Sequence, residues 1–151
     1  MTDACDISLR PPAPDHNPPP DEIKNILSES KTIAIIGLSD KPGRASLDVG
    51  LYLKDHGYTV IPVHPKISDW RGIKTYSSLK DVPGPVDIVD IFRKADAIDG
   101  LVEEIVEKKP RVVWLQLGIV NNEAAVKIRK AGIVVVQDRC LKIEHSSLLG
   151  R

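Results

Sequence analysis

Short apolar runs alternate with longer amphipathic segments along most of the chain. The apolar runs are rich in isoleucine and valine, and the segments between them repeat apolar residues every three or four positions. This alternation is typical of βαβ units around a parallel sheet. It predicts five strands, apolar enough to be covered on both faces: residues 32–37, 59–63, 87–92, 112–117 and 133–137.

The amphipathic segments predict helices on both faces of this sheet. Asp21 is expected to cap a first helix that ends near Glu29, with Ile23, Ile26 and Leu27 on its buried face. Further helices are predicted at residues 45–56, 77–81, 95–108 and 123–130. Residues 65–85 lack a full helical repeat, so a loop with one short helix is expected there.

Right-handed crossovers between these elements predict an α/β fold, a doubly wound, Rossmann-like parallel sheet of five strands in the order 3-2-1-4-5. Ligands of such sheets bind where the strand order reverses, which places a site between the carboxyl ends of strands one and four. A length of 151 residues fits one domain. We expect this domain at residues 21–151, preceded by a flexible, proline-rich arm at residues 1–20.

Charge and cysteine usage narrow the classes of partner and compartment. Lys and Arg number 21, as do Asp and Glu, so no overall basic field draws the chain to nucleic acid or a membrane surface. The apolar runs are shorter than the roughly 20 residues of a membrane span, and the acidic N-terminus does not resemble an export signal. The two cysteines, Cys5 and Cys140, form no disulfide framework or metal pattern. A cytoplasmic protein is expected.

The turn after the first predicted strand carries the candidate chemistry. Gly37 ends the strand, Gly43 follows six residues later, and a helix begins near Arg44. Backbone N–H groups and a helix N-terminus would then face one crevice, which favours an anion. Side chains of this turn add hydroxyl groups and positive charge that suit pyrophosphate: Ser39, Lys41, Arg44 and Ser46.

The turn is not the dinucleotide fingerprint G-x-G-x-x-G. The second glycine position holds Ser39, and the acid that normally binds the ribose hydroxyls of NAD at the end of strand two is missing. Strand two closes instead with Val63, His64, Pro65 and Lys66. A cation there suits a ribose phosphate better than a bare diol.

Five segments in order resemble the small CoA-binding proteins whose fold matches the N-terminal domain of the succinyl-CoA synthetase α subunit. They are Ile-Gly-Leu-Ser-Asp-Lys-Pro-Gly-Arg (36–44), Ile-Pro-Val-His-Pro-Lys (61–66), Val-Asp-Ile-Phe-Arg (89–93), Val-Trp-Leu-Gln-Leu-Gly (113–118) and Asp-Arg-Cys-Leu-Lys-Ile-Glu-His (138–145). Two positions depart from the pattern. His64 stands where relatives often have asparagine, and Leu38 stands where alanine is common.

The resemblance implies coenzyme A as the ligand and assigns parts of it to parts of the chain. The first turn would hold the diphosphate, the end of strand two would flank adenine and the 3′-phosphate, and strand four would lie near the pantetheine arm. The candidate CoA-binding residues are Gly37, Ser39, Lys41, Pro42, Arg44, Ser46, Val63, His64, Pro65, Lys66, Ile91, Phe92, Arg93, Gln116 and Gly118.

Three functions follow from this pattern. The first is a module without its own chemistry that binds CoA or acyl-CoA as a carrier, sensor or protein partner in acyl-CoA metabolism. No catalytic residue is assigned, because the phosphorylated histidine and ATP-grasp partner of the related synthetases are not found in this sequence. The second is an NADP-dependent oxidoreductase, in which Arg44 and Lys66 would face the 2′-phosphate.

The third function is a CoA-linked redox regulator. Cys140 follows the last strand, so its thiol is expected at the same sheet edge as the glycine turn. The neighbouring Arg139 would favour the thiolate and a mixed disulfide with CoA. The other interpretation is a buried, inert thiol beside a structural pair formed by Asp138 and Arg139.

Overall fold

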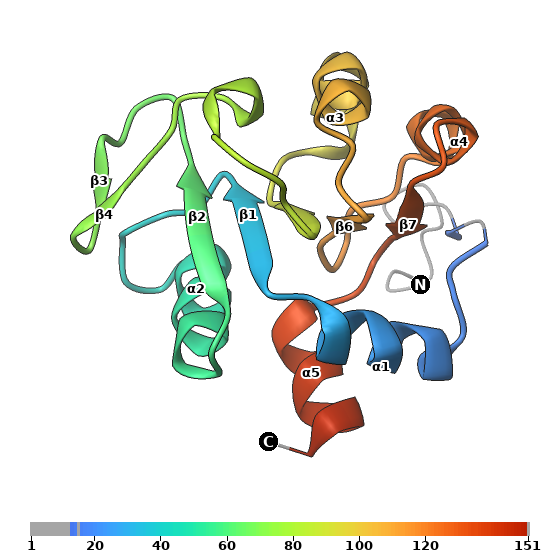
Figure 1. Cartoon of the computed structure of the whole chain (residues 1–151), viewed down its shortest axis with the longest axis horizontal. Coiled ribbons are helices and arrows are strands. Elements are labelled where there is room, and N and C mark those ends of the chain that lie inside the picture. Colours follow the sequence, from blue (N-terminus) through green and yellow to red (C-terminus); the bar gives the residue numbers. More distant parts are fainter. Residues whose placement is uncertain (1–12, 15, 151) are drawn as a thin grey trace, which may run out of the picture.

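The computed structural model describes residues 13, 14 and 16–150, arranged around one parallel sheet (Figure 1). The α/β class and the five parallel strands predicted from the sequence are confirmed. Most of the predicted arm at residues 1–20 lies outside the described residues. The strands of the sheet are β1 (Thr32–Ile36), β2 (Thr59–Val63), β5 (Ile88–Ile91), β6 (Val112–Leu115) and β7 (Val134–Val136).

The predicted strand order was wrong. The sheet runs β2-β1-β5-β6-β7, which is 2-1-3-4-5 when the five strands are numbered along the chain. The connection between β2 and β5 carries Leu79, Val82 and Val86, which pack on the face of β1 that holds Ala34 and Ile36. Because this connection crosses over β1, β5 pairs on the far side of β1. The strand order therefore reverses between β1 and β5, and the site expected between strands one and four moves there.

Helices cover both faces of the sheet, as Figure 1 shows. One face carries α1 (Pro20–Glu29), α2 (Ala45–Asp55) and α5 (Leu141–Leu149), and the other carries α3 (Val102–Lys108) and α4 (Asn122–Lys130). Each face has its own apolar core, and isoleucine, leucine and valine form most of both. No helix of the described residues is long and apolar enough to cross a membrane.

Several helices differ from their predictions for local reasons. Pro19 occupies the N-cap of α1 and Pro20 its first position, so Asp21 lies inside the helix. The helix predicted at 95–108 begins as two short 3₁₀ turns, Ala95–Ala97 and Asp99–Leu101, and becomes α-helical only after Gly100. The helix predicted at 77–81 is a 3₁₀ turn at Leu79–Asp81. The sequence pattern missed α5, because its apolar residues do not repeat on one face.

Two further features were not predicted. A small hairpin of β3 (Asp69–Trp70) and β4 (Ile73–Lys74) lies beyond β2 and buries Trp70 completely. At the opposite edge of the sheet, Asn17 exchanges two hydrogen bonds of 2.8 Å with the backbone of Gln137, just after β7. This asparagine therefore acts like one residue of an additional strand at the β7 edge.

Candidate functional site

The turn after β1 requires glycine at its first position. The N–H of Gly37 donates to the carbonyl oxygen of Val63 at 2.9 Å, which extends the β1–β2 ladder by one residue. Gly37 has φ +87°, and a Cβ atom there would lie 2.7 Å from the carbonyl oxygen of Phe92. Both the left-handed conformation and the close approach of the backbone after β5 exclude a larger residue.

Two serines hold the turn in shape. The N–H of Ser39 donates to Ser46 Oγ and the N–H of Lys41 donates to Ser39 Oγ, each at 3.0 Å. Behind the turn, the indole Nε1–H of Trp70 donates to the carbonyl oxygen of Ser39 at 2.9 Å. The hairpin that carries Trp70 is therefore a support for the turn, although it lies far from it in sequence.

The amino end of α2 opens toward the same space. Arg44 is the N-cap, and among the described residues no side chain caps this helix end. The first N–H groups of an uncapped helix lack intrahelical acceptors and carry partial positive charge. They are suited to a bound anion.

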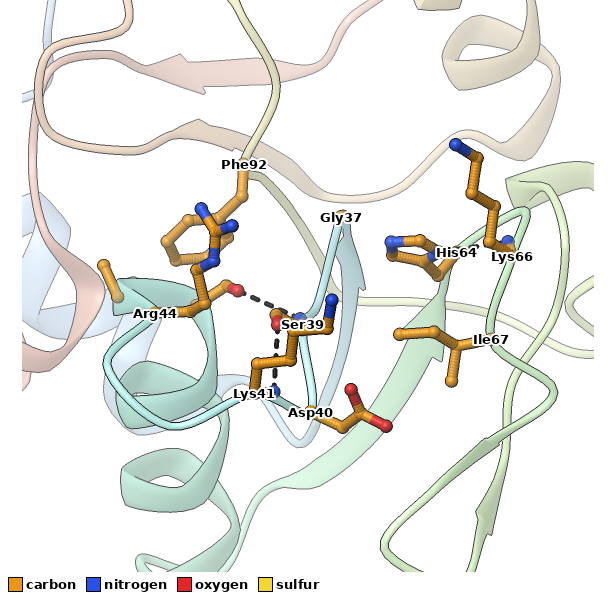
Figure 2. A pocket seen from close by; sticks show the side chains of 11 residues that line it. Gly37, Ser39, Asp40, Lys41, Arg44, His64, Lys66, Ile67 and Phe92 are labelled. Carbon is orange, nitrogen blue, oxygen red and sulfur yellow. Dashed lines mark hydrogen bonds between the residues drawn. The ribbon is translucent and has the colours of Figure 1, made fainter.

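These groups line a pocket of about 630 Å³ between β1, α2 and the segment after β2 (Figure 2), which we call the turn pocket. Cations predominate among its charged residues. They are Lys41, Arg44 and Lys66, whereas Asp40 is the one acid in the lining. The complete lining is Gly37, Ser39, Asp40, Lys41, Arg44, Ala45, Ser46, His64, Lys66, Ile67 and Phe92.

His64 lies at the β2 side of the turn pocket and is partly buried. Its backbone N–H donates to the carbonyl oxygen of Tyr76 at 2.8 Å, and its ring Nδ1 lies 3.0 Å from the backbone N–H of Lys66. Burial lowers the pKa of the imidazole, and the positive charges of Arg93 and Lys66 lower it further, against an opposing effect of Asp40.

A second pocket, of about 620 Å³, continues along the carboxyl edge of the sheet; we call it the edge pocket. Ala45 and Phe92 line both pockets, so the two are adjacent. The lining of the edge pocket is mainly apolar and includes Leu117, whose side chain is 63% exposed. The complete set is Ala45, Phe92, Arg93, Lys94, Ala95, Gln116, Leu117, Gly118, Ile119 and Cys140.

Polar side chains fix the loops around the edge pocket. The buried Gln116 accepts the N–H of Leu141 through Oε1 at 3.2 Å, at the start of α5. Asp138, which has φ +57°, accepts the N–H of Gly118 through Oδ1 at 2.6 Å. Arg139 donates to the carbonyl oxygen of Asp138 at 2.8 Å rather than to its carboxylate. Asp138 and Arg139 thus shape the loop that places Cys140 at the pocket.

The structure brings together most of the residues singled out from the sequence. The turn pocket contains Gly37, Ser39, Lys41, Arg44, Ser46, His64, Lys66 and Phe92, and the edge pocket contains Phe92, Arg93, Gln116, Gly118 and Cys140. Four candidates line neither pocket. Val63 and Ile91 are buried in the core beneath, and Pro42 and Pro65 are exposed.

Sequence reasoning missed seven lining residues: Asp40, Ala45, Ile67, Lys94, Ala95, Leu117 and Ile119. Leu117 and Ile119 carried a signal, because they are apolar residues placed directly after a strand, at the edge where ligands bind. Ala45 carried another, as the first residue of a helix that follows a glycine-rich turn.

Asp90 is an unusual buried acid in β5, the middle strand of the sheet. It lies in β5 beside Ile35 and Trp114, two residues before Phe92, and is fully buried. Neither carboxyl oxygen has a hydrogen-bond partner among the described residues. Burial alone raises the pKa of this carboxyl well above its ordinary value, so it holds its proton where an exposed acid is charged. Within the described chain, no cluster of side chains suits a metal ion.

Comparison with known proteins agrees with this arrangement. An uncharacterized protein of Bacillus subtilis, YneT, is 45% identical over 130 residues, which cover 86% of this chain and 96% of that protein. An ADP-forming acetate–CoA ligase of Methanocaldococcus jannaschii is 33% identical over 135 residues, 84% of this chain but only 19% of the ligase. A solved structure of a hypothetical protein from Pyrococcus horikoshii superposes with a TM-score of 0.86 at 38% identity and covers 93% of this chain and 99% of its own.

The family model described as a CoA binding domain matches residues 31–146, from the start of β1 into α5. This range contains every residue of the turn pocket and the edge pocket. The resemblance noted in the sequence is thereby confirmed, and the chain belongs to the CoA-binding domain family.

Proposed function

We propose that this protein binds coenzyme A or an acyl-CoA across the two adjacent pockets. The observation that carries the proposal is the division of the site into a cation-rich half and a mainly apolar half, whose charged residues are Arg93 and Lys94. The two halves meet at Ala45 and Phe92. CoA has the same division, with a phosphorylated nucleotide at one end and an uncharged pantetheine arm at the other. The site lies where the strand order reverses, the usual binding position in open α/β sheets.

The turn pocket would hold the phosphorylated end. The diphosphate would lie against the turn and the amino end of α2, with Lys41 and Arg44 as counter-charges. The hydrogen bonds of Ser39 and Ser46 support this assignment, because they constrain the backbone of the turn that would contact the diphosphate. Lys66 and His64 would then lie beside the adenosine end.

The edge pocket would hold the pantetheine arm. Phe92, Leu117 and Ile119 offer apolar surface to its methylene and dimethyl groups. Cys140 lies in the same pocket, so the thiol of the ligand or its acyl group would be directed toward that side chain.

A binding role without catalysis is the form of the function that the site supports best. The side chains of Asp138 and Gln116, which could otherwise take part in chemistry, accept hydrogen bonds from backbone N–H groups of the surrounding loops. The chain matches only 19% of the length of the M. jannaschii ligase. We therefore propose a carrier, a sensor or a partner module of acyl-CoA metabolism, acting in the cytoplasm.

Calorimetric titration of one protein batch with CoA, acetyl-CoA, NAD, NADP and ADP tests this proposal. We expect CoA and acetyl-CoA to bind more tightly than ADP, because only they reach both pockets. NADP shares a ribose phosphate with CoA but lacks the arm, so it is the critical competitor. Binding of NADP without CoA would overturn the proposal in favour of an oxidoreductase.

A further inference from the structure

One of the two ring nitrogens of His64, Nδ1, has a hydrogen-bonding role that the structure fixes. The backbone N–H of Lys66 lies 3.0 Å from Nδ1. A backbone N–H can only donate, so Nδ1 accepts and the neutral ring carries its proton on Nε2. Figure 2 shows the ring reaching into the space between Gly37 and Lys66. His64 therefore presents an N–H donor to the turn pocket.

Charges from three segments surround this ring. Arg93 follows β5, Lys66 belongs to the loop of His64 itself, and Asp40 belongs to the turn after β1. Lys41 and Arg44 line the same pocket from the turn and the start of α2. Tyr76, beside the hairpin, faces His64 through its backbone carbonyl. Burial lowers the pKa of the imidazole, and the cations, which outnumber the single acid, lower it further, so the neutral ring is favoured.

A phosphate monoester in this pocket would reverse the sign of the charge that the ring experiences. Its oxygens only accept hydrogen bonds, and its dianion cancels the positive charge of Arg93 and Lys66 around the imidazole. An opposite charge within a few ångströms favours the protonated form of histidine. The proton enters at Nδ1 from solvent, and the hydrogen bond from the N–H of Lys66 is released.

We propose that His64 recognises a terminal phosphate monoester by donating from Nε2 and taking up a proton as the ligand binds, which selects 3′-phosphorylated nucleotides over those with a bare ribose. The inference rests on the proposed CoA site and makes His64 the residue that sets its specificity. Asparagine could donate to the same phosphate but could not become charged, and lysine would be charged before and after binding. Histidine alone links affinity to pH.

The consequence is a pH-dependent affinity. Affinity for a 3′-phosphorylated ligand should rise as the pH falls from about 8 toward 6.5, by at most tenfold per pH unit for one linked proton. Near pH 6 the phosphate itself begins to take up a proton, and the rise should end. A ligand without the 3′-phosphate should show a flat profile over the same range.

Calorimetry on the full chain with CoA and 3′-dephospho-CoA tests the inference. Titrations at pH 7.5 in buffers of different ionisation enthalpy count the protons taken up. We expect greater uptake with CoA than with dephospho-CoA, and we expect His64→Asn to abolish the difference. His56→Asn is the matched control, because His56 is an exposed histidine at the far end of α2 and should retain the wild-type pattern.

A second measurement needs no variant. The ring proton shifts of His64, followed by NMR across pH with and without CoA, should report an apparent pKa that rises on binding. CoA binding with equal proton uptake in wild type and His64→Asn, or with an unmoved His64 titration, would overturn the inference and leave the CoA site intact. Failure of CoA to bind at all would overturn the proposed function and this inference with it.

Discussion

The two halves of the site are built from different parts of the chain. The turn pocket is shaped by backbone, through the left-handed Gly37, the bonded serines of the turn and the uncapped start of α2. The edge pocket is shaped by side chains, and one of its apolar residues, Leu117, is mostly exposed. A binding site that is formed by backbone groups accepts a narrow range of ligand shapes. Exposed apolar side chains can change conformation to accommodate different acyl groups. We infer that the nucleotide end provides specificity and that the arm end tolerates variation.

Replacing Gly37 should have the largest effect on the turn pocket and on CoA binding. Gly37→Ala places a Cβ 2.7 Å from the carbonyl oxygen of Phe92, and the left-handed backbone adds a strain of about 1–2 kcal/mol. The turn must shift, so CoA affinity should fall by more than tenfold and the midpoint of thermal unfolding should fall as well. Calorimetry and thermal denaturation measure the two effects.

The matched control is Gly43→Ala in the same turn. Gly43 has φ +88°, almost the value of Gly37, but a Cβ there would meet nothing within 4 Å. The control therefore carries the backbone strain without the clash, and it should retain more CoA affinity than Gly37→Ala. Equal losses in the two variants would show that strain alone, and not the contact with Phe92, makes glycine necessary.

Removing charge from the turn pocket should have the next largest effect. Arg44→Ala is expected to weaken CoA binding by about 1.5 kcal/mol, roughly tenfold, if the guanidinium contacts the diphosphate. The loss should shrink at high salt, because exposed charges are screened. Lys94→Ala removes a cation from the edge pocket instead and should cost much less. Calorimetry at two salt concentrations compares the variants, and a larger loss for Lys94→Ala would reverse the assignment of the two halves.

The next prediction concerns Asp90 in β5, the strand that is followed directly by Phe92, which lines both pockets. The folded protein holds the proton of this carboxyl to higher pH than the unfolded chain does, because burial raises its folded pKa. Stability therefore falls as the pH rises from the unfolded value toward the folded pKa, by up to about 1.4 kcal/mol per pH unit. Asp90→Asn cannot titrate, so its stability advantage over wild type should grow with pH.

Chemical denaturation of wild type and Asp90→Asn between pH 5 and 8 measures that trend. Asp96→Asn serves as the control, since it makes the same substitution at an exposed position of a 3₁₀ turn. A constant difference for Asp90→Asn would mean that the carboxyl is charged in the folded protein and has a partner in solution.

The fold was predictable where local pattern decides it. The five strands were recognised because isoleucine and valine fill both faces of each, as in Ile33–Ile36 and Val112–Val113. Strand order was not, because it depends on which face of β1 receives Leu79, Val82 and Val86, a long-range packing choice. Helix α5 was missed because it packs against both α1 and α2, so its apolar residues are spread around it.

The site, like the fold, was predictable only where it is formed by residues that are close in sequence. Local motifs located the turn pocket, since Gly37, Ser39 and Arg44 lie within one short segment. They gave less of the edge pocket, whose lining comes from segments after β5, β6 and β7 that meet only in the folded sheet. The support of the turn by Trp70 was likewise invisible, because it joins residues 31 positions apart.

The smallest expected effect comes from Leu117, and it tests whether the edge pocket holds the pantetheine arm. Leu117→Ser removes apolar surface from the edge pocket, so CoA affinity should fall by about 0.5–1 kcal/mol, two- to fivefold. Adenosine 3′,5′-bisphosphate, which lacks the arm, should bind the variant and the wild type equally. Val126→Ser is the control, because Val126 is also an exposed apolar residue, 44% exposed, but lies on α4 outside both pockets. If Leu117→Ser weakens both ligands equally, the edge pocket does not hold the arm. A loss confined to CoA would instead place the arm beside Leu117.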